Sequence, residues 1–280
     1  MNGMPGMLYL VPTPIGNLGD ISRRCGEILE QVDFIAAEDT RVTLRLLNHM
    51  ELKKKLVSYH RHNADTAGNA ILERLLAGES CALVTDAGTP AISDPGEDLV
   101  ALCAANQVEV CAIPGPCALV VALSVSGLPT GRFTFEGFLP LNKKNRRAQL
   151  EALKIEERTM LFYEAPHKLM ATLRDFADAF GGERRIALCR ELTKLHEEIY
   201  RTTLSQALAR YEAEPPRGEF VLVVEGAAPA VKESDPDSAL ERVLALREEG
   251  LSLKAACKQA GEEFGVPKNL LYDMAVSGKD

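Results

Sequence analysis

Residues 81–96 (CALVTDAGTPAISDPG) constrain the fold of this chain more than any other stretch. A short apolar run gives way at Thr85 and Asp86 to small and turn-forming residues. This change predicts a buried strand followed by a shaped loop at its carboxyl end. Open α/β sheets bind their ligands at that edge, so the loop is a candidate binding site.

Two other apolar runs also end in loops that are rich in glycine and proline. Residues 9–11 lead into 12–17 (PTPIGN), and residues 108–113 lead into 114–118 (PGPCA). Because all three loops follow predicted strands, we expect them to meet at one edge of a sheet. The sequence therefore predicts one pocket for a small molecule.

The order of segments predicts an α/β protein with two α/β domains and a helical tail. Through residue 116, strand-like runs alternate with helical patterns, which favours a parallel sheet covered by helices on both faces. A helix at 117–126 and a break at 127–131 introduce a second domain, whose short connections favour a mixed sheet. Residues 227–236 are typical of a linker, and the helical segments after it resemble a helix-turn-helix. The predicted domains are 1–116, 117–228 and 236–280. The predicted strands are 8–11, 34–37, 55–58, 82–85 and 108–113 in the first domain, and 133–136, 159–163, 185–189, 197–203 and 219–224 in the second.

The charge of the chain excludes one class of nucleic-acid-binding protein. A net charge of −8 and a pI near 5.3 argue against a protein that coats nucleic acid electrostatically. Cations nevertheless cluster at 53–62 and 143–147, and local basic loops can meet a phosphate backbone. The alternative is that these runs are solvated loop tips. No apolar run reaches membrane-spanning length and the N-terminus lacks a basic signal region, so we expect a cytoplasmic protein with no membrane partner.

Several common cofactor motifs are missing from the sequence. It has neither a G-x-G-x-x-G after the first strand nor a G-x-x-x-x-G-K-[ST] motif, and the prolines at 12–17 remove N–H donors from a phosphate cradle. A ligand without phosphates, held largely by backbone groups, is the simplest interpretation. The seven cysteines form no C-x-x-C pair, and His60 and His62 are an isolated pair, so we expect no metal site.

Longer motifs, in order along the chain, carry a resemblance to a known family. They are 10–18 (LVPTPIGNL), 36–41 (AAEDTR), 84–90 (VTDAGTP), 93–96 (SDPG), 114–117 (PGPC), 135–140 (FEGFLP), 162–164 (FYE) and 190–194 (RELTK). The chain resembles the tetrapyrrole methylase family of S-adenosyl-L-methionine-dependent methyltransferases. In particular, it is similar to the members that methylate a cytidine 2′-oxygen in small-subunit (16S) ribosomal RNA.

The resemblance implies a homodimer whose cofactor, S-adenosyl-L-methionine, lies in the cleft between two α/β domains, and a small ribosomal subunit or its RNA as substrate. The loops after the strands, together with one residue of the second domain, are then expected to hold the cofactor. The candidate cofactor residues are Pro12, Asp86, Ala87, Gly88, Ile92, Cys117, Ala118 and Tyr163. Structural alternatives are that Asp86 only caps a turn and that Tyr163 is a core residue.

The chemistry of a ribose hydroxyl suggests catalytic candidates, among which the sequence does not choose. A 2′-hydroxyl is a poor nucleophile until its proton leaves, so a carboxylate or imidazole would act as general base. The candidates are Glu38, Asp39, Glu164, His60 and His62, with Arg41 to neutralise a neighbouring phosphate. Alternatively, Glu38 and Asp39 only begin a helix, and Arg41 pairs locally with a carboxylate.

The basic run at 143–147 is the candidate RNA-binding loop. Its cations are Lys143, Lys144, Arg146 and Arg147. Two other functions remain open from the sequence: methylation of a tetrapyrrole precursor, and nucleic-acid binding without catalysis through the helical tail. The basic run and the tail disfavour the first, and the elaborate set of cleft loops disfavours the second.

Overall fold

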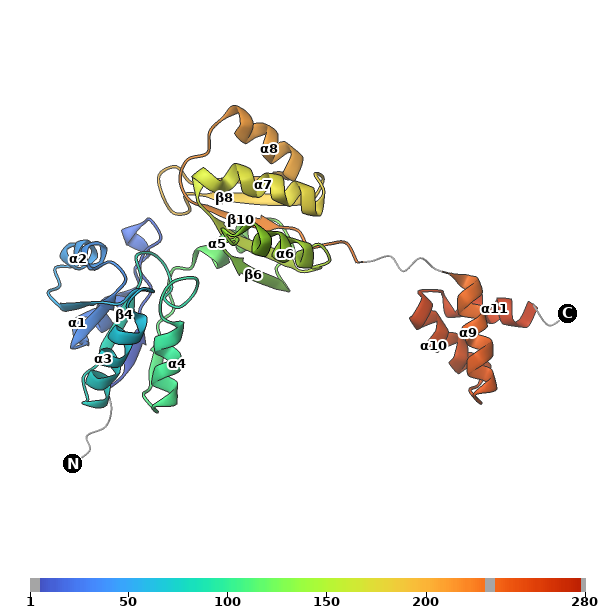
Figure 1. Ribbon diagram of the computed structural model, residues 1–280, viewed down its shortest axis with the longest axis horizontal. Helices are drawn as coiled ribbons and strands as arrows, with labels where there is room; N and C mark the ends of the chain where they lie inside the picture. The colour runs from blue at the N-terminus through green and yellow to red at the C-terminus, as the bar shows by residue number, and fades with distance from the viewer. Residues whose placement is uncertain (1–5, 230–234, 278–280) are drawn as a thin grey trace. The chain divides into compact units, whose positions relative to one another are not determined.

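The computed structural model describes residues 6–229 and 235–277 (Figure 1). The chain divides into two compact units, Met1–Gly226 and Ala227–Asp280. The first unit contains two sheets and the second contains helices. This architecture confirms the predicted fold class, while the finer division at residues 116 and 228 stays a prediction.

The first sheet is parallel throughout, as the alternating pattern predicts. Its order is β3-β2-β4-β1-β5, so the loops after β1 and β4 leave adjacent central strands. All five strands point the same way, which brings their carboxyl ends to one edge. The strands are β1 (Leu8–Leu10), β2 (Phe34–Ala37), β3 (Lys55–Ser58), β4 (Cys81–Val84) and β5 (Val110–Ala112).

Helices cover both faces of this sheet because the buried strands are apolar on both sides. Phe34 and Leu83 face the cluster built with α3 (Ala64–Leu76) and α4 (Glu97–Ala105). Ile35 and Val84, their neighbours in sequence, face the cluster built with α1 (Arg23–Gln31) and α2 (Thr40–His49). The alternation follows from the two-residue period of a strand. A short 3-10 helix, η1 (Leu18–Asp20), precedes α1.

The second sheet is mixed, as its short connections predict. Its order is β6-β7-β10-β8-β9, with β6 and β7 parallel and the other pairs antiparallel. The strands are β6 (Phe133–Gly137), β7 (Thr159–Glu164), β8 (Arg185–Arg190), β9 (Glu198–Thr203) and β10 (Phe220–Val224). One face packs against α5 (Ala118–Val125), and the other packs against α6 (Lys143–Leu153), α7 (Pro166–Phe180) and α8 (Leu204–Ala213).

The second unit holds α9 (Pro236–Glu248), α10 (Leu253–Phe264) and α11 (Lys268–Ser277) around a small core. The Ser252 side chain accepts from the Ala255 N–H, and Gly265 ends α10 with φ of 69°, as its capping pattern predicts. Among the described residues of the whole chain, no helix is long and apolar enough to cross a membrane.

One local prediction is wrong: residues 143–147 are not a loop. They form the first turns of α6, which begins at Lys143. The Asn142 side chain caps this helix by accepting from the N–H groups of Lys144 and Asn145. Cations are unfavourable beside the positive end of a helix dipole, so the basic run lacked the usual charge signature of a helix start.

Candidate active site

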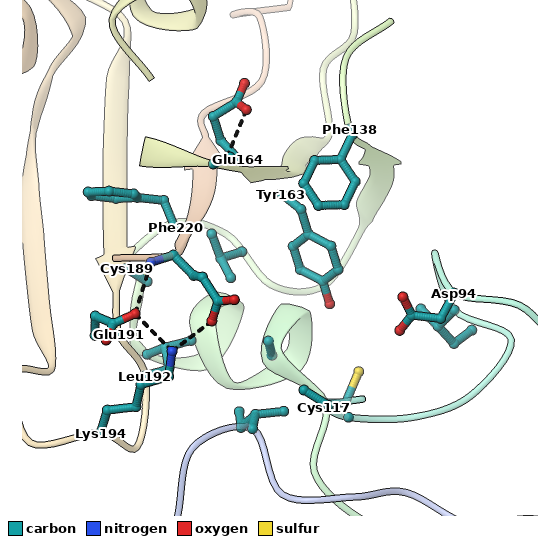
Figure 2. A pocket seen from close by; sticks show the side chains of 18 of the residues that line it. Asp94, Cys117, Phe138, Tyr163, Glu164, Cys189, Glu191, Leu192, Lys194 and Phe220 are labelled. Carbon is teal, nitrogen blue, oxygen red and sulfur yellow. Dashed lines mark hydrogen bonds and ion pairs between the residues drawn. The ribbon is translucent and has the colours of Figure 1, made fainter. Parts of the chain in front are cut away.

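A cavity of about 470 Å³ lies where the loops at the carboxyl edge of the first sheet meet the second sheet. Its walls come from the loops after β1, β4 and β5, the start of α5, the ends of β7 and β8, and the start of β10 (Figure 2). The lining residues are Ile15, Ala87, Gly88, Thr89, Ile92, Asp94, Cys117, Ala118, Phe138, Tyr163, Glu164, Ala165, Pro166, His167, Cys189, Glu191, Leu192, Lys194, Glu219, Phe220 and Val221. The volume suits a ligand of about drug size.

Hydrogen bonds tie the three loops of the first sheet together. The Thr13 N–H donates to the Gly88 carbonyl, and the Gly88 N–H donates to the Thr13 carbonyl, each over 3.0 Å. The Thr89 hydroxyl donates to the Pro116 carbonyl over 2.8 Å. Gly88 has φ of +86°, and a Cβ there would lie 3.4 Å from Ile15 Cγ2. The loop after β4 therefore approaches the cavity with backbone alone, which glycine permits.

An aromatic wall closes the side of the cavity that belongs to the second sheet. The Tyr163 ring packs edge-on against Phe135 and Phe138, with centroid distances of 4.9 Å and 5.7 Å. Burial, followed by the nearby Cys117 thiol, raises the pKa of Tyr163 well above its ordinary value. Its hydroxyl therefore stays neutral and can both donate and accept. A flat heterocycle with polar edges suits such a wall.

A charged network borders the cavity near the end of β8. The Lys194 ammonium lies 2.8 Å from Glu191 Oε1 and 2.7 Å from Glu219 Oε2. Burial opposes the charged lysine, but the hydrogen bonds to the two carboxylates outweigh it, and the pKa of Lys194 is raised. Glu191 and Thr193 have φ of 49° and 65°, which costs backbone strain. Such strain often accompanies functional sites.

Carboxyl groups gather at the edge of the first sheet. Burial, and then the neighbouring Glu38, raise the pKa of Asp94 to about 6. Burial also raises the pKa of Glu38, with Asp86 adding to it, and burial raises the pKa of Asp86. The Arg61 guanidinium opposes these shifts at Asp94 and Glu38, and it donates to the Ser93 carbonyl over 2.5 Å. The Asp94 carboxyl at this edge can therefore gain or lose a proton near pH 6.

Most of the predicted cofactor residues come together in this cavity. Those that line it are Ala87, Gly88, Ile92, Cys117, Ala118 and Tyr163. Asp86 instead lines a neighbouring cavity of about 270 Å³ with Thr13 and Thr85, and its carboxylate accepts from the Asp39 N–H over 3.1 Å. Pro12 is buried beside Gly115 and does not line the cavity.

The predicted catalytic carboxylates are largely engaged in structural contacts. Asp39 caps α2 and pairs with Arg41 over 2.6 Å, which corresponds to the structural alternative for both residues. Glu164 is 4 % exposed; it accepts from the Ala165 N–H over 2.8 Å and from the Thr172 hydroxyl. Figure 2 shows its carboxylate directed away from the cavity. Glu38 is half-buried at the carboxyl edge of β2.

The predicted RNA-binding cations divide into exposed and anchored side chains. Lys143, Lys144 and Arg147 are exposed. Arg146 instead donates to Asp175 over 2.5 Å and to Thr172 over 2.8 Å, joining α6 to α7. A groove of about 730 Å³ runs beside these helices, lined in part by Lys143, Arg146 and Arg147.

Sequence reasoning missed several residues of the cavity wall, although the motifs that contain them are visible in the sequence. Asp94 belongs to the SDPG motif, Phe138 to FEGFLP, and Glu191 and Lys194 to RELTK. The His60 and His62 rings lie 6.0 Å apart, and they are not among the residues that line the cavity. The described part of the chain contains no group of three or more His, Cys, Asp or Glu side chains that could hold a metal ion.

The sequence of this chain matches known protein families and known proteins. Residues 7–208 match the family described as Tetrapyrrole (Corrin/Porphyrin) Methylases, and residues 233–279 match the RsmI C-terminal HTH domain. Ribosomal RNA small subunit methyltransferase I of Synechocystis sp. is 47% identical over 272 residues, covering 97% of this chain and 98% of that protein. The protein of the same name from Escherichia coli O157:H7 is 46% identical over 273 residues, with 97% and 95% covered.

Two solved structures of similar fold carry the name of a methyltransferase. The methyltransferase CobJ superposes with a TM-score of 0.60 at 19% identity, covering 80% of this chain and 95% of the other. Uroporphyrin-III C-methyl transferase from Thermus thermophilus, complexed with S-adenosyl homocysteine, gives 0.57 at 15% identity, with 78% and 97% covered. At these identities the likeness shows the fold. The family match over residues 7–208 and the full-length relatives establish that the chain belongs to the tetrapyrrole methylase family of methyltransferases.

Proposed function

We propose that this protein transfers a methyl group from S-adenosyl-L-methionine to the 2′-oxygen of a cytidine in small-subunit ribosomal RNA. The observation that carries the proposal is the full-length similarity, at 46–47% identity, to proteins named ribosomal RNA small subunit methyltransferase I. The match extends through residues 233–279, the helical unit that lies beyond the methylase domain.

The cavity fits the proposed cofactor in size and in chemistry. The aromatic wall at Tyr163 offers a surface for the adenine ring, and the bare backbone at Gly88 leaves room for the rest of the molecule. When bound, the cofactor supplies an activated methyl group on a sulfonium. The protein then has to place the ribose oxygen in line with that methyl group, and positioning alone can supply effective molarities of about 10⁵ M or more.

For RNA binding, the exposed cations of α6 and the helical unit are the proposed contacts. Lys143, Lys144 and Arg147 present positive charge beside a groove, on a chain whose net charge is −8. Local cations on an acidic protein favour binding at one place over unspecific coating. We further propose that the protein is a cytoplasmic homodimer; sedimentation that gave a 30.5 kDa monomer at working concentration would contradict the dimer.

A labelling experiment tests the function and its alternatives. The protein is incubated with methyl-labelled S-adenosyl-L-methionine and with unmodified small subunits, naked ribosomal RNA or a tetrapyrrole precursor. The expected result is label in the RNA, recovered as 2′-O-methylcytidine after digestion. Label in the tetrapyrrole would support the alternative that the solved fold relatives suggest. RNA binding without any label would point to a protein that binds nucleic acid without catalysis.

A further inference from the structure

We propose that the Asp94 carboxylate is the general base that takes the proton from the ribose 2′-hydroxyl. This inference rests on the proposed function and assigns a catalytic role to a residue of the SDPG motif. It differs from the candidates that sequence patterns suggest, which lie after β2, after β3 and at the end of β7.

Asp94 lines the candidate cofactor cavity on the loop between β4 and α4. Figure 2 shows its carboxylate directed into the cavity, toward the Tyr163 hydroxyl and the Cys117 thiol. A base for methyl transfer has to reach the oxygen that attacks the methyl group, so it has to lie on the wall of this same cavity.

Within the described parts of the chain, the Asp94 carboxylate takes part in no hydrogen bond or ion pair. Two of the competing carboxylates are occupied: Asp39 by Arg41, and Glu164 by Thr172 and the Ala165 N–H. Glu38, a third competitor, does not line the cavity. Asp86 accepts from the Asp39 N–H and lies outside the cavity. A half-buried carboxylate without a partner is poised to accept a proton from a ligand.

Several groups face Asp94 from the surrounding elements: Glu38 after β2, Arg61 after β3, Asp86 after β4, and Tyr163 on β7. Burial and the two carboxylates hold the pKa of Asp94 near 6, while Arg61 keeps it from rising further. A base with a pKa near the working pH combines substantial ionisation with sufficient basicity.

The proposed step transfers one proton and one methyl group. The 2′-hydroxyl proton passes to an Asp94 oxygen while the ribose oxygen bonds to the methyl carbon. The bond between sulfur and that carbon breaks, and its electron pair stays on sulfur as a neutral thioether. Asp94 then returns its proton to solvent, and no oxidant or further reactant is needed.

The experiment measures kcat and kcat/KM of Asp94→Asn on unmodified small subunits across pH 5 to 9. The wild-type kcat/KM should fall with increasing acidity below about pH 6, because the protonated carboxyl accepts no proton. Asp94→Asn should lower kcat about 10²-fold or more and lose the acid limb. Glu97→Gln, an exposed carboxylate in the first turn of α4, is the matched control and should keep both.

Two neighbours supply a readout that a structural role of Asp94 would not move. Glu38→Gln removes a negative charge and should shift the acid limb to lower pH, whereas Arg61→Gln should shift it to higher pH. Asp94→Glu should retain part of the activity, and added formate should partly restore Asp94→Ala. Affinity for S-adenosylhomocysteine, which carries no sulfonium charge, should be unchanged in Asp94→Asn and reports that the cavity is folded.

The outcomes separate this inference from the proposed function. Wild-type protein that forms no 2′-O-methylcytidine refutes the proposed function. Wild-type activity together with an Asp94→Asn variant that keeps its kcat or its acid limb refutes the role of Asp94 alone. A variant that loses affinity for S-adenosyl-L-methionine but keeps kcat at saturation would show that Asp94 binds the sulfonium, which also overturns the role of base.

Discussion

The aliphatic stem of Lys194 packs on Gly16 so closely that a Cβ at Gly16 would lie 2.4 Å from Lys194 Cγ. This contact joins the loop after β1 to the loop after β8 beside the cavity. The lysine reaches on to Glu191 and Glu219, so one side chain links the two α/β parts of the first unit. The two walls of the cavity are therefore coupled mechanically at this point.

The first prediction concerns that contact. Gly16→Ala should lower both the unfolding free energy and the affinity for S-adenosyl-L-methionine, because the new methyl group forces the two loops apart. Lys194→Ala removes the obstacle, so the cost of Gly16→Ala should be smaller in that background. The coupling energy from a double-mutant cycle should be about 1 kcal/mol or more. Gly131→Ala, whose Cβ would have no neighbour within 4 Å, is the control. A coupling energy near zero would contradict the prediction.

The second prediction separates backbone strain from cavity shape. Gly88 and Gly181 have nearly equal φ, +86° and +87°, but only Gly88 lines the cavity. Valine at either position should cost about 1–3 kcal/mol of stability through strain. Calorimetry should show at least a tenfold loss of cofactor affinity for Gly88→Val and unchanged affinity for Gly181→Val. Equal affinities in the two folded variants would remove the loop after β4 from the site.

The third prediction uses neighbouring arginines of α6 as a matched pair. Arg147 is exposed, whereas Arg146 is held by Asp175 and Thr172. Arg147→Ala should reduce the salt dependence of RNA binding by about 0.7–0.9 in log K against log salt, without loss of stability. Arg146→Ala should instead lower stability by about 1–2 kcal/mol. Salt titrations and denaturant unfolding measure the two effects, and the reverse assignment would refute this prediction.

The fourth prediction assigns Glu164 to structure rather than to chemistry. Glu164→Gln keeps the shape but weakens the acceptor of the Ala165 N–H and the Thr172 hydroxyl. Stability should fall by about 1–3 kcal/mol in urea unfolding, since the side chain is 4 % exposed. The pH dependence of kcat/KM should keep its acid limb. The exposed Glu183→Gln is the control, and loss of the acid limb in Glu164→Gln would make Glu164 the better candidate for the base.

The local pattern of the sequence determined the two sheets and the loops that line the cavity. Runs such as 81–85, which end abruptly in small residues, already predict that Ala87 and Gly88 follow a buried strand. The parallel first sheet, the mixed second sheet and the capping of α10 follow from periodicity and turn chemistry, which are properties of neighbouring residues. The helix start at 143 escaped this reasoning because its charges oppose the usual pattern.

Only the tertiary structure decided which polar side chains remain free to act. Asp39, Glu164 and Asp94 are all carboxylates that follow or end predicted strands, yet two of them are occupied by partners. The third lines the cavity and has no hydrogen-bond or ion-pair partner among the residues that the structure describes. Arg146 likewise differs from Arg147 through Asp175 and Thr172, which lie 29 and 26 positions away from it in the sequence. The packing of α6 on α7 brings Arg146 to Asp175, and the burial of Asp94 beside the cavity raises the pKa of its carboxyl. Periodicity carries no information about these long-range contacts, so they can be found only in the folded chain.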